Sequence, residues 1–266
     1  MPKLMTHLVA NYPNPLGFSN AVSAMFESSV DFLEIQLPFS NPLADGPLIY
    51  EANQIGLTFG QNLAEILTQV STIYKQKNCK TKLFLMSYLT PILALGIENV
   101  VNLCGQNNFV GFIIPDLIFG SPEQKELSQL CQNNENQKMQ LIPVISPLTT
   151  RIRLEKIKKE LQLGQIIYAM ARSGRTGNST DLTQIQDYLD FLKENLAGFE
   201  IAIGFGIKEK SQVEFLNQQD FIAVIGSEII RQIQTAEQNP SLIEEKIKSF
   251  LETFLDKTRP KNLEKL

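Results

Sequence analysis

Short apolar runs alternate with amphipathic segments along the whole chain. Most of these runs are rich in β-branched and aromatic side chains, which is typical of strands buried on both faces. We expect strands at residues 4–10, 30–37, 82–88, 109–115, 139–145, 165–171, 199–205 and 221–227. The amphipathic segments between them predict helices, so strand and helix should alternate from one end of the chain to the other.

Several amphipathic segments begin with residues that cap helices. A Ser or Asp followed three residues later by Glu or Gln has the capping-box spacing, in which side chain and backbone exchange hydrogen bonds. The pairs are Ser121 with Gln124, Asp181 with Gln184, and Ser241 with Glu244. Pro122 supports the first of these starts, because proline is favoured at the first helical position.

Eight strands, each followed by a helix, fit one (β/α)₈ TIM barrel, an α/β fold. The chain has no linker-like or low-complexity stretch, so we predict a single TIM-barrel domain over residues 1–266. An open doubly wound sheet is the alternative. That fold usually carries a glycine-rich fingerprint after its first strand, and "VANYPNPLG" is not one.

The composition narrows the classes of partner and compartment. The 266 residues carry a formal net charge of -4 and no long basic block, which argues against nucleic acid or an anionic membrane as a partner. No stretch approaches the roughly 20 apolar residues of a membrane span, and no signal-peptide pattern opens the chain. Cys79, Cys104 and Cys131 form neither a disulfide framework nor a zinc pattern, so we expect reduced thiols in a cytoplasmic protein.

The single histidine of the chain, His7, lies in the apolar run "LMTHLVA". One histidine cannot anchor a histidine-based metal site, and we interpret His7 as a structural residue. We therefore expect no metal, and any acid–base chemistry must rest on carboxylates.

Two carboxylates stand out at the second predicted strand. In "FLEIQL" the side chains alternate between barrel interior and helix layer, so Glu34 and Gln36 should point inward while Leu33 and Ile35 pack under helices. Burial should raise the pKa of Glu34, as a general acid–base group near neutral pH requires. Asp45 follows on "NPLADGP", a loop stiffened by prolines that would hold a second acid in place. The alternatives are that Glu34 is paired with an interior base and that Asp45 only caps the next segment.

Glycine-bearing loops follow the last three predicted strands, where barrel enzymes often bind phosphate. Glycines let backbone N–H groups approach an anion closely, and the start of a helix offers free N–H groups and a positive dipole end. The loop residues are Gly174, Thr176 and Gly177 after the sixth strand, Gly204 and Gly206 after the seventh, and Gly226 and Ser227 after the eighth. Any one of these glycines can serve a tight turn alone, but three such loops in neighbouring positions predict a phosphate site.

The segment with the two acids, "LEIQLPFSNPLADGP", resembles the signature E-[LI]-G-x-P-[FY]-S-D-P-x-A-D-G-P of the tryptophan synthase alpha subunit family. The similarity runs along nearly the whole chain. "FLMSYLTPILALGIENVV" resembles the family's third strand and helix, and "GFIIPDLIFGSPE" its fourth strand and loop. "YAMARSGRTG", "IGFGIKEKSQV" and "VIGSEIIRQI" resemble its sixth, seventh and eighth strand ends, in order.

This resemblance implies a lyase of tryptophan biosynthesis. Family members are TIM barrels that cleave indole-3-glycerol phosphate to indole and glyceraldehyde 3-phosphate, without metal or organic cofactor. Glu34 matches the family's acid–base carboxylate, and Asp45 matches the carboxylate that accepts the indole N–H. The implied substrate-binding residues are Tyr88, Tyr168 and Phe205 around the flat ring, Thr176 on a closing loop, and Gly177, Gly206, Gly226 and Ser227 at the phosphate.

The resemblance also implies a partner. Family members work in a complex with a beta subunit that carries pyridoxal phosphate and receives the indole directly. We therefore expect an α2β2 heterotetramer with allosteric coupling, and no cofactor in this chain. Asn41, Pro42 and Asp116 match positions that face the beta subunit.

Several residues on the functional face depart from the family pattern. Gln36 stands for the usual glycine, and we expect its long side chain to narrow the indole pocket. The other departures are Asn11 for glycine, Asn41 for aspartate, Thr90 for asparagine, Ile118 for proline, Ala171 for serine and Arg175 for a small apolar residue. The chain also opens almost directly on the first strand, so we expect it to lack the short helix that covers the barrel floor in the family.

Three functions are compatible with these residues. The retained acids, Glu34 and Asp45, favour a working lyase. The departures on the functional face favour an alpha subunit that has lost efficient cleavage and acts mainly as an allosteric activator of the beta subunit. Another phosphate-binding barrel, such as a sugar-phosphate isomerase, fits the glycine loops but does not account for the long motif around the two acids.

Overall fold

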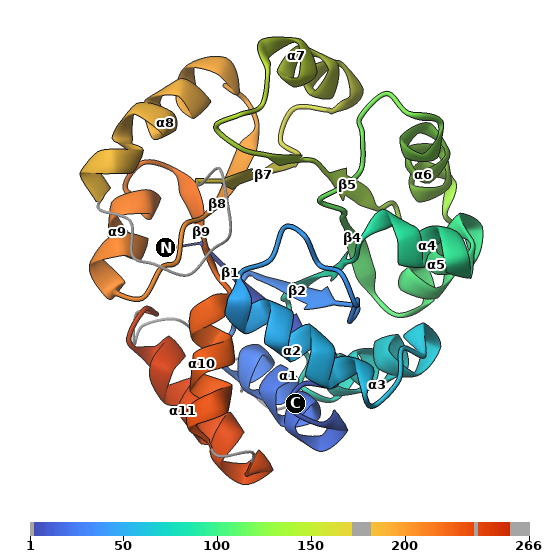
Figure 1. Ribbon diagram of the computed structural model, residues 1–266, viewed down its shortest axis with the longest axis vertical. Coiled ribbons are helices and arrows are strands. Elements are labelled where there is room, and N and C mark those ends of the chain that lie inside the picture. The colour runs from blue at the N-terminus through green and yellow to red at the C-terminus, as the bar shows by residue number, and fades with distance from the viewer. Residues whose placement is uncertain (1–2, 172–181, 237–238, 256–266) are drawn as a thin grey trace.

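The computed structural model of the chain describes residues 3–171, 182–236 and 239–255. Within these residues one parallel sheet runs in the order β5-β4-β3-β2-β1-β9-β8-β7-β6. The strands are β1 (Leu4–Val9), β2 (Phe32–Gln36), β3 (Lys82–Met86), β4 (Phe109–Ile113), β5 (Gln140–Ile142), β6 (Val144–Ile145), β7 (Ile166–Met170), β8 (Glu200–Gly204) and β9 (Phe221–Ile225). Figure 1 looks along the resulting barrel, with the strands at its centre and the helices around them.

Helices cover the outside of the sheet and alternate with the strands, as the sequence pattern predicts. They are α1 (Pro15–Glu27), α2 (Pro47–Leu57), α3 (Leu63–Gln76), α4 (Leu89–Leu95), α5 (Ile97–Gln106), α6 (Pro122–Asn133), α7 (Arg151–Glu160), α8 (Leu182–Asn195), α9 (Lys210–Asn217), α10 (Ser227–Thr235) and α11 (Pro240–Glu252). β1 is the first element in the described part of the chain.

The predicted helix starts are confirmed at one place and corrected at another. Ser121 caps α6, because its hydroxyl accepts the N–H of Gln124 at 3.2 Å. Asp181 lies outside the described residues. The predicted cap at Ser241 is wrong, since Asn239 caps α11 and its side chain accepts the Ser241 N–H at 3.1 Å. Asparagine is as good an N-cap as serine, and the proline that follows it favours this earlier start.

The strand predicted at residues 139–145 is divided in two. Pro143 has no N–H to donate, and it separates β5, which pairs with β4, from β6, which pairs with β7. The Pro143 carbonyl still accepts the N–H of Tyr168 at 2.9 Å, so the barrel closes across the break. The predicted eight-stranded barrel is therefore confirmed, with its fifth strand interrupted at the proline.

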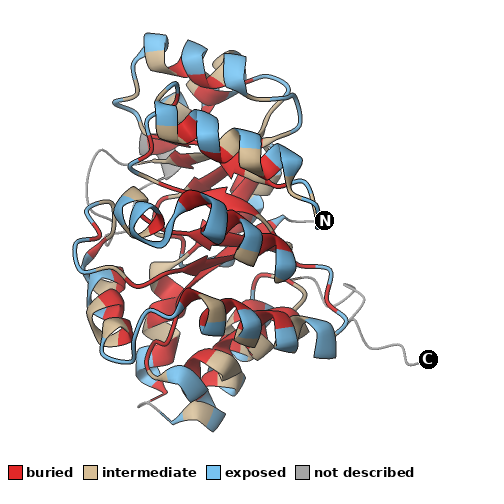
Figure 2. Ribbon diagram, turned by 90° about the vertical axis from the view of Figure 1, so that its right-hand side faces the viewer, coloured by how far each residue is buried: buried red, intermediate tan, exposed pale blue. Residues whose placement is uncertain are grey.

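Two apolar clusters stabilise the barrel. One lies between the sheet and the helices and includes Leu33, Ile35 and Leu37 from around β2. The other lies inside the barrel and includes Phe32 of the same strand. This alternation confirms that Glu34, two residues after Phe32, faces inward. Figure 2 shows the strands buried, while the outer faces of the helices are exposed.

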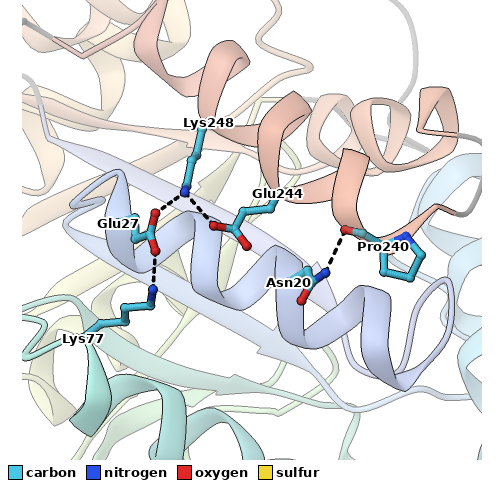
Figure 3. A network of polar contacts seen from close by, with 6 residues as sticks. All are labelled: Asn20, Glu27, Lys77, Pro240, Glu244 and Lys248. Atoms are coloured by element: carbon cyan, nitrogen blue, oxygen red, sulfur yellow. Dashed lines mark hydrogen bonds and ion pairs between the residues drawn. The ribbon is translucent and has the colours of Figure 1, made fainter.

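Helices from early and late parts of the chain pack side by side at the lower left of Figure 1, where α11 contacts both α1 and α10. Figure 3 shows that Lys248 of α11 pairs with Glu27, at the end of α1, and with Glu244 at 2.6 Å. Glu27 also pairs with Lys77, which follows α3. Burial raises the pKa of Glu27, but the two lysine ammonium groups outweigh burial and hold that pKa below its usual value. This Glu27 ion-pair network ties α11 to the ends of α1 and α3.

Candidate active site

A cavity opens among the loops that follow the carboxyl ends of the strands. The space within its lining is about 750 Å³ when the solvent-open mouth is counted. Its polar lining comes from His7, Glu34, Asp45, Tyr168 and Ser227. Apolar side chains from several strands complete the wall, among them Met86, Ile113, Val144 and Val224. The cavity therefore combines an apolar wall with acidic groups, as a site for a largely apolar ligand requires.

Glu34 projects from β2 into this cavity and is only 2% exposed. Its Oε2 lies 3.2 Å from Nδ1 of His7, its register partner on β1. Burial raises the pKa of Glu34, His7 lowers it and Asp45 raises it further, with a net rise. The raised pKa expected from the position of Glu34 in its strand is therefore confirmed.

His7 is a site residue that sequence reasoning missed. It lines the cavity and is 5% exposed, so its interpretation as a purely structural residue is corrected. The alternative that Glu34 is paired with an interior base holds, and His7 is that base. The sequence offers one indication of this role. His7 lies two residues after Met5 on the same strand, and Met5 faces the barrel interior, so His7 faces it as well. Which residue of β2 it meets depends on the register between the strands, which the sequence does not reveal.

Asp45 lies on the loop after β2 and is held by two donors. Its Oδ2 accepts a hydrogen bond from Gln36 Nε2 at 2.7 Å and another from the Tyr88 hydroxyl at 3.2 Å. Burial raises the pKa of Asp45, while His7, Gln36 and Tyr88 restrain that rise. The expectation that Gln36 narrows the pocket is wrong, because Gln36 turns to Asp45 and does not line the cavity.

The loop that carries Asp45 is held by hydrogen bonds to neighbouring elements. The Phe39 N–H donates to the side chain of Asn53 on α2 at 2.9 Å. The Ala44 N–H donates to the Tyr88 hydroxyl at 2.9 Å. Since Tyr88 also donates to Asp45, one phenol anchors both the loop and the acid.

Three of the residues predicted to bind phosphate line the same cavity. Gly206, Gly226 and Ser227 all line it. α10 begins at Ser227, and Gly226 before it offers no side-chain cap, so the first N–H groups of this helix are left for a ligand. Gly206 has a φ of 82°, a left-handed backbone that favours glycine. The predicted positions 174–177 lie outside the described residues.

The aromatic residues predicted around a flat ring are placed in three different environments. Tyr168 lines the cavity. Tyr88 is buried in the inner cluster with its hydroxyl on Asp45. Phe205 lies in the cluster between sheet and helices, which corrects its predicted position beside the ring. Gly204 takes the cavity-facing position at the end of β8, so the residue after it turns to the other face.

The residues predicted to face a partner lie on loops at the cavity end of the barrel. Asn41 is exposed, whereas Pro42 is buried within the chain, which removes Pro42 from that surface. Its neighbour Leu43 is 73% exposed instead. Asp116 is exposed and accepts the Leu89 N–H at 2.9 Å, so it also caps the start of α4.

Three further features bear on function. Within residues 3–171, 182–236 and 239–255, no group of three or more His, Cys, Asp or Glu side chains is arranged to hold a metal ion. No helix in that part of the chain is long and apolar enough to cross a bilayer. Cys79, Cys104 and Cys131 are buried free thiols.

Sequence comparison gives one consistent family. The family model described as "Tryptophan synthase alpha chain" matches residues 1–259. The tryptophan synthase alpha chain of Syntrophotalea carbinolica is 34% identical over 229 residues, which cover 86% of this chain and 87% of that protein. The tryptophan synthase alpha chain of Desulforapulum autotrophicum is 33% identical over 234 residues, which cover 87% and 88%.

Solved structures give the same fold. A mutant tryptophan synthase alpha-subunit from Pyrococcus furiosus superposes with a TM-score of 0.80 at 24% identity, covering 96% of this chain and 99% of that one. Tryptophan synthase from Mycobacterium tuberculosis gives a TM-score of 0.80 at 21% identity, covering 96% and 93%. A chain of the tryptophan synthase complex from Pyrococcus furiosus gives 0.77 at 24% identity, covering 95% and 97%.

Proposed function

The chain belongs to the tryptophan synthase alpha chain family, and from that membership we propose that its cavity cleaves indole-3-glycerol phosphate to indole and glyceraldehyde 3-phosphate. The observation that supports this most is the meeting of two acids and an uncapped helix start in one cavity. Glu34 and Asp45 are suited to proton transfer on a ring, and the helix start is suited to a phosphate. We also propose that residues 1–266 form a single domain and that this domain catalyses the reaction.

The chemistry assigns a proton-transfer role to Glu34. The bond between ring carbon C3 and the glycerol chain breaks after C3 is protonated, because the ring then leaves as neutral indole and not as a carbanion. The glycerol hydroxyl loses its proton as its oxygen becomes the aldehyde oxygen. A carboxyl group with a raised pKa exchanges protons readily near neutral pH, which supports Glu34 as the group that serves C3.

Asp45 would stabilise the charge that this protonation creates. A proton on C3 leaves positive charge on the ring nitrogen, and an ionised carboxylate that accepts the N–H offsets it. The hydrogen bonds from Gln36 and Tyr88 favour the ionised form of Asp45. Both donors bind Oδ2, which leaves Oδ1 for the ring N–H.

The rest of the substrate would lie along the same wall. Tyr168 and the apolar side chains of the inner cluster suit the flat faces of an indole ring. The phosphate would bind the N–H groups at Gly206, Gly226 and Ser227. We extend the proposal to Gly177 as a further phosphate ligand and to Thr176 on the loop before it, in line with the family resemblance.

A beta subunit is the partner, as the family's structures from tryptophan synthase complexes support. We propose an α2β2 heterotetramer of cytoplasmic location, in which pyridoxal phosphate belongs to the beta chain. Asn41, Leu43 and Asp116 would face that chain, together with Ile118, which is 68% exposed. Contact with a partner would remove the large apolar side chains of Leu43 and Ile118 from water, which is favourable.

The regulatory alternative loses its main argument. It rested on a pocket crowded by Gln36, and that side chain turns to Asp45 and leaves the cavity clear. Asn41, Thr90 and Ile118 differ from the family pattern on exposed positions, where they bear on docking and not on proton transfer. Catalysis is therefore the function that the geometry supports best.

Indole release from indole-3-glycerol phosphate tests the proposal directly. We expect the purified chain to release indole, faster with its beta partner, and Glu34→Gln to slow release by roughly 10²–10⁴-fold, the usual contribution of a general acid–base group. Thermal unfolding of the same variant controls for loss of structure. No release by the wild-type chain, together with faster condensation of serine and indole by the beta chain, would establish the regulatory role instead.

A further inference from the structure

His7 and Glu34 form a buried pair inside the cavity. The register between β1 and β2 places them opposite each other, and Nδ1 of the histidine lies 3.2 Å from Oε2 of the glutamate. The family resemblance gives Glu34 both proton transfers and gives His7 no role. A lone carboxyl group would have to protonate C3 and then turn to the glycerol hydroxyl, two atoms at different places on the substrate.

Each member of the pair has one polar atom left over. Nε2 of His7 and Oε1 of Glu34 are buried and make no hydrogen bond of normal geometry to the part of the chain that the structure describes, although the Gln36 side chain lies close enough to His7 to raise its pKa. A buried polar atom without a partner costs free energy comparable to a lost hydrogen bond. Both atoms are closed off from water in this structure, but both residues line the cavity, so a small rotation of either side chain brings its unpartnered atom to a bound substrate. The pair therefore offers two separate polar atoms to a ligand.

We propose, on the premise of the lyase function above, that His7 and Glu34 act together as an acid–base dyad. Glu34 donates a proton through Oε1 to C3 of the ring, and His7 takes the proton of the glycerol hydroxyl through Nε2. The C3–H bond forms, the O–H bond breaks, and the C–C bond breaks as the hydroxyl oxygen becomes the aldehyde oxygen. The dyad holds the same number of protons before and after. Exchange with water returns each group to its starting form once the products have left.

The contact between the two side chains couples the two transfers. Burial lowers the pKa of His7, but Glu34, Asp45 and the side chain of Gln36 together outweigh burial and raise it above its usual value. When Glu34 gives its proton to the ring, negative charge appears beside the imidazole and makes it a stronger base. The imidazole thus gains basicity at the step in which the hydroxyl proton must leave. The other titratable group on this wall is the Tyr168 hydroxyl, whose pKa burial raises.

Variants of His7 separate this role from packing. His7→Asn keeps a donor where Nδ1 lies but has no base at the position of Nε2. We expect its kcat to fall by about 100-fold, the lower end for one general base because Glu34 remains, with KM little changed. Thr6→Val is the matched control, since Thr6 is equally buried one residue away on β1 and does not line the cavity. We expect wild-type kinetics from the control.

Chemical rescue by free imidazoles distinguishes a catalytic role of His7 from a purely structural one. His7→Ala leaves space at the cavity wall, and we expect imidazole to restore part of its indole release. Among substituted imidazoles the restored rate should rise with the pKa of the added base. A kcat of His7→Asn within about threefold of wild type, or rescue that does not depend on the base, would overturn the dyad.

The wild-type chain provides a test that needs no change at His7. His7 is the single histidine of the sequence, so its imidazole gives one set of NMR signals free of overlap from other histidines. We expect Glu34→Gln to lower the pKa of His7 in an NMR titration, and an unchanged titration would contradict the dyad. If the wild-type chain releases no indole, the proposed lyase function fails and the dyad with it. Release with normal His7 variants overturns the dyad alone.

Discussion

The hydrogen bond between Gln36 and Asp45 gives the sharpest prediction for the site. Gln36 donates to Asp45 Oδ2 at 2.7 Å, while its own Oε1 is buried with no partner among the described residues. Gln36→Met keeps the length of the side chain and removes both the donor and the unpartnered oxygen. A hydrogen bond to a charged group contributes about 1.5–3 kcal/mol, and an unsatisfied buried oxygen costs about 1–3 kcal/mol. The two effects on folding oppose each other, so the free energy of unfolding should change by less than about 2 kcal/mol.

The effect on catalysis has no such compensation. Without the amide, Asp45 loses one of the two donors that position it and favour its ionised form. If the whole hydrogen bond is expressed in the transition state, kcat/KM falls by about 10- to 150-fold, since 1.4 kcal/mol is a factor of ten. The pKa of Asp45 rises in the variant, so less of it is ionised at low pH. The loss should therefore be greater at pH 6 than at pH 8.

Steady-state indole release at the two pH values, beside chemical denaturation, measures both effects. Gln124→Met is the matched control, because Gln124 is a glutamine 1% exposed on α6 that does not line the cavity. We expect that control to alter stability without altering kcat/KM. A Gln36→Met chain that keeps kcat/KM within about twofold at both pH values would refute the role given to Gln36.

Three further changes test separate features of the chain. Gly206→Ala places a side chain at a φ of 82°, so the free energy of unfolding should fall by about 1–2 kcal/mol. Because Gly206 is proposed to bind the phosphate, KM should also rise. Unfolding curves measure the first effect and steady-state kinetics the second. Asn11 has a φ of 59° and its Nδ2 donates to the Gly60 carbonyl at 3.2 Å. Asn11→Gly, which loses the hydrogen bond alone, should destabilise by about 1 kcal/mol, and Asn11→Ala by about 1 kcal/mol more in the same assay. Lys248→Met removes two ion pairs of partly exposed groups and should cost about 0.5–1 kcal/mol at pH 7. The pKa of Glu27 is lower in the folded than in the unfolded chain. The stability that ionised Glu27 contributes is therefore present above its unfolded pKa and lost as the pH falls through its folded pKa. The stability difference between wild type and Lys248→Met should accordingly shrink in acid, and also in high salt, which screens the ion pairs.

What the sequence predicted well follows from local periodicity. Side chains of a strand alternate, so an acid in the apolar run "FLEIQL" had to face the barrel interior, and Glu34 does. The loop after it could be predicted to be rigid because prolines restrict the backbone wherever they occur. These predictions need no knowledge of which strands are neighbours.

What the sequence did not predict depends on contacts between segments. His7 meets Glu34 through the register between two consecutive strands, and Gln36 meets Asp45 through the fold of a loop. Phe205 and Pro42 lie beyond the ends of strands, where alternation no longer indicates which way a side chain turns. The interruption at Pro143 was visible as a residue, but that the barrel closes across it depends on β7.

The first strand of the barrel is completed by segments that a ribosome makes much later. β1 pairs with β2 on one side and with β9 on the other, and α1 packs on α11. While the nascent chain grows, one edge of β1 stays unpaired until β9 leaves the exit tunnel, and the face of α1 that packs on α11 stays uncovered until α11 follows. Chains released early should therefore aggregate and offer an unpaired strand to chaperones, and no part-made barrel should hold substrate.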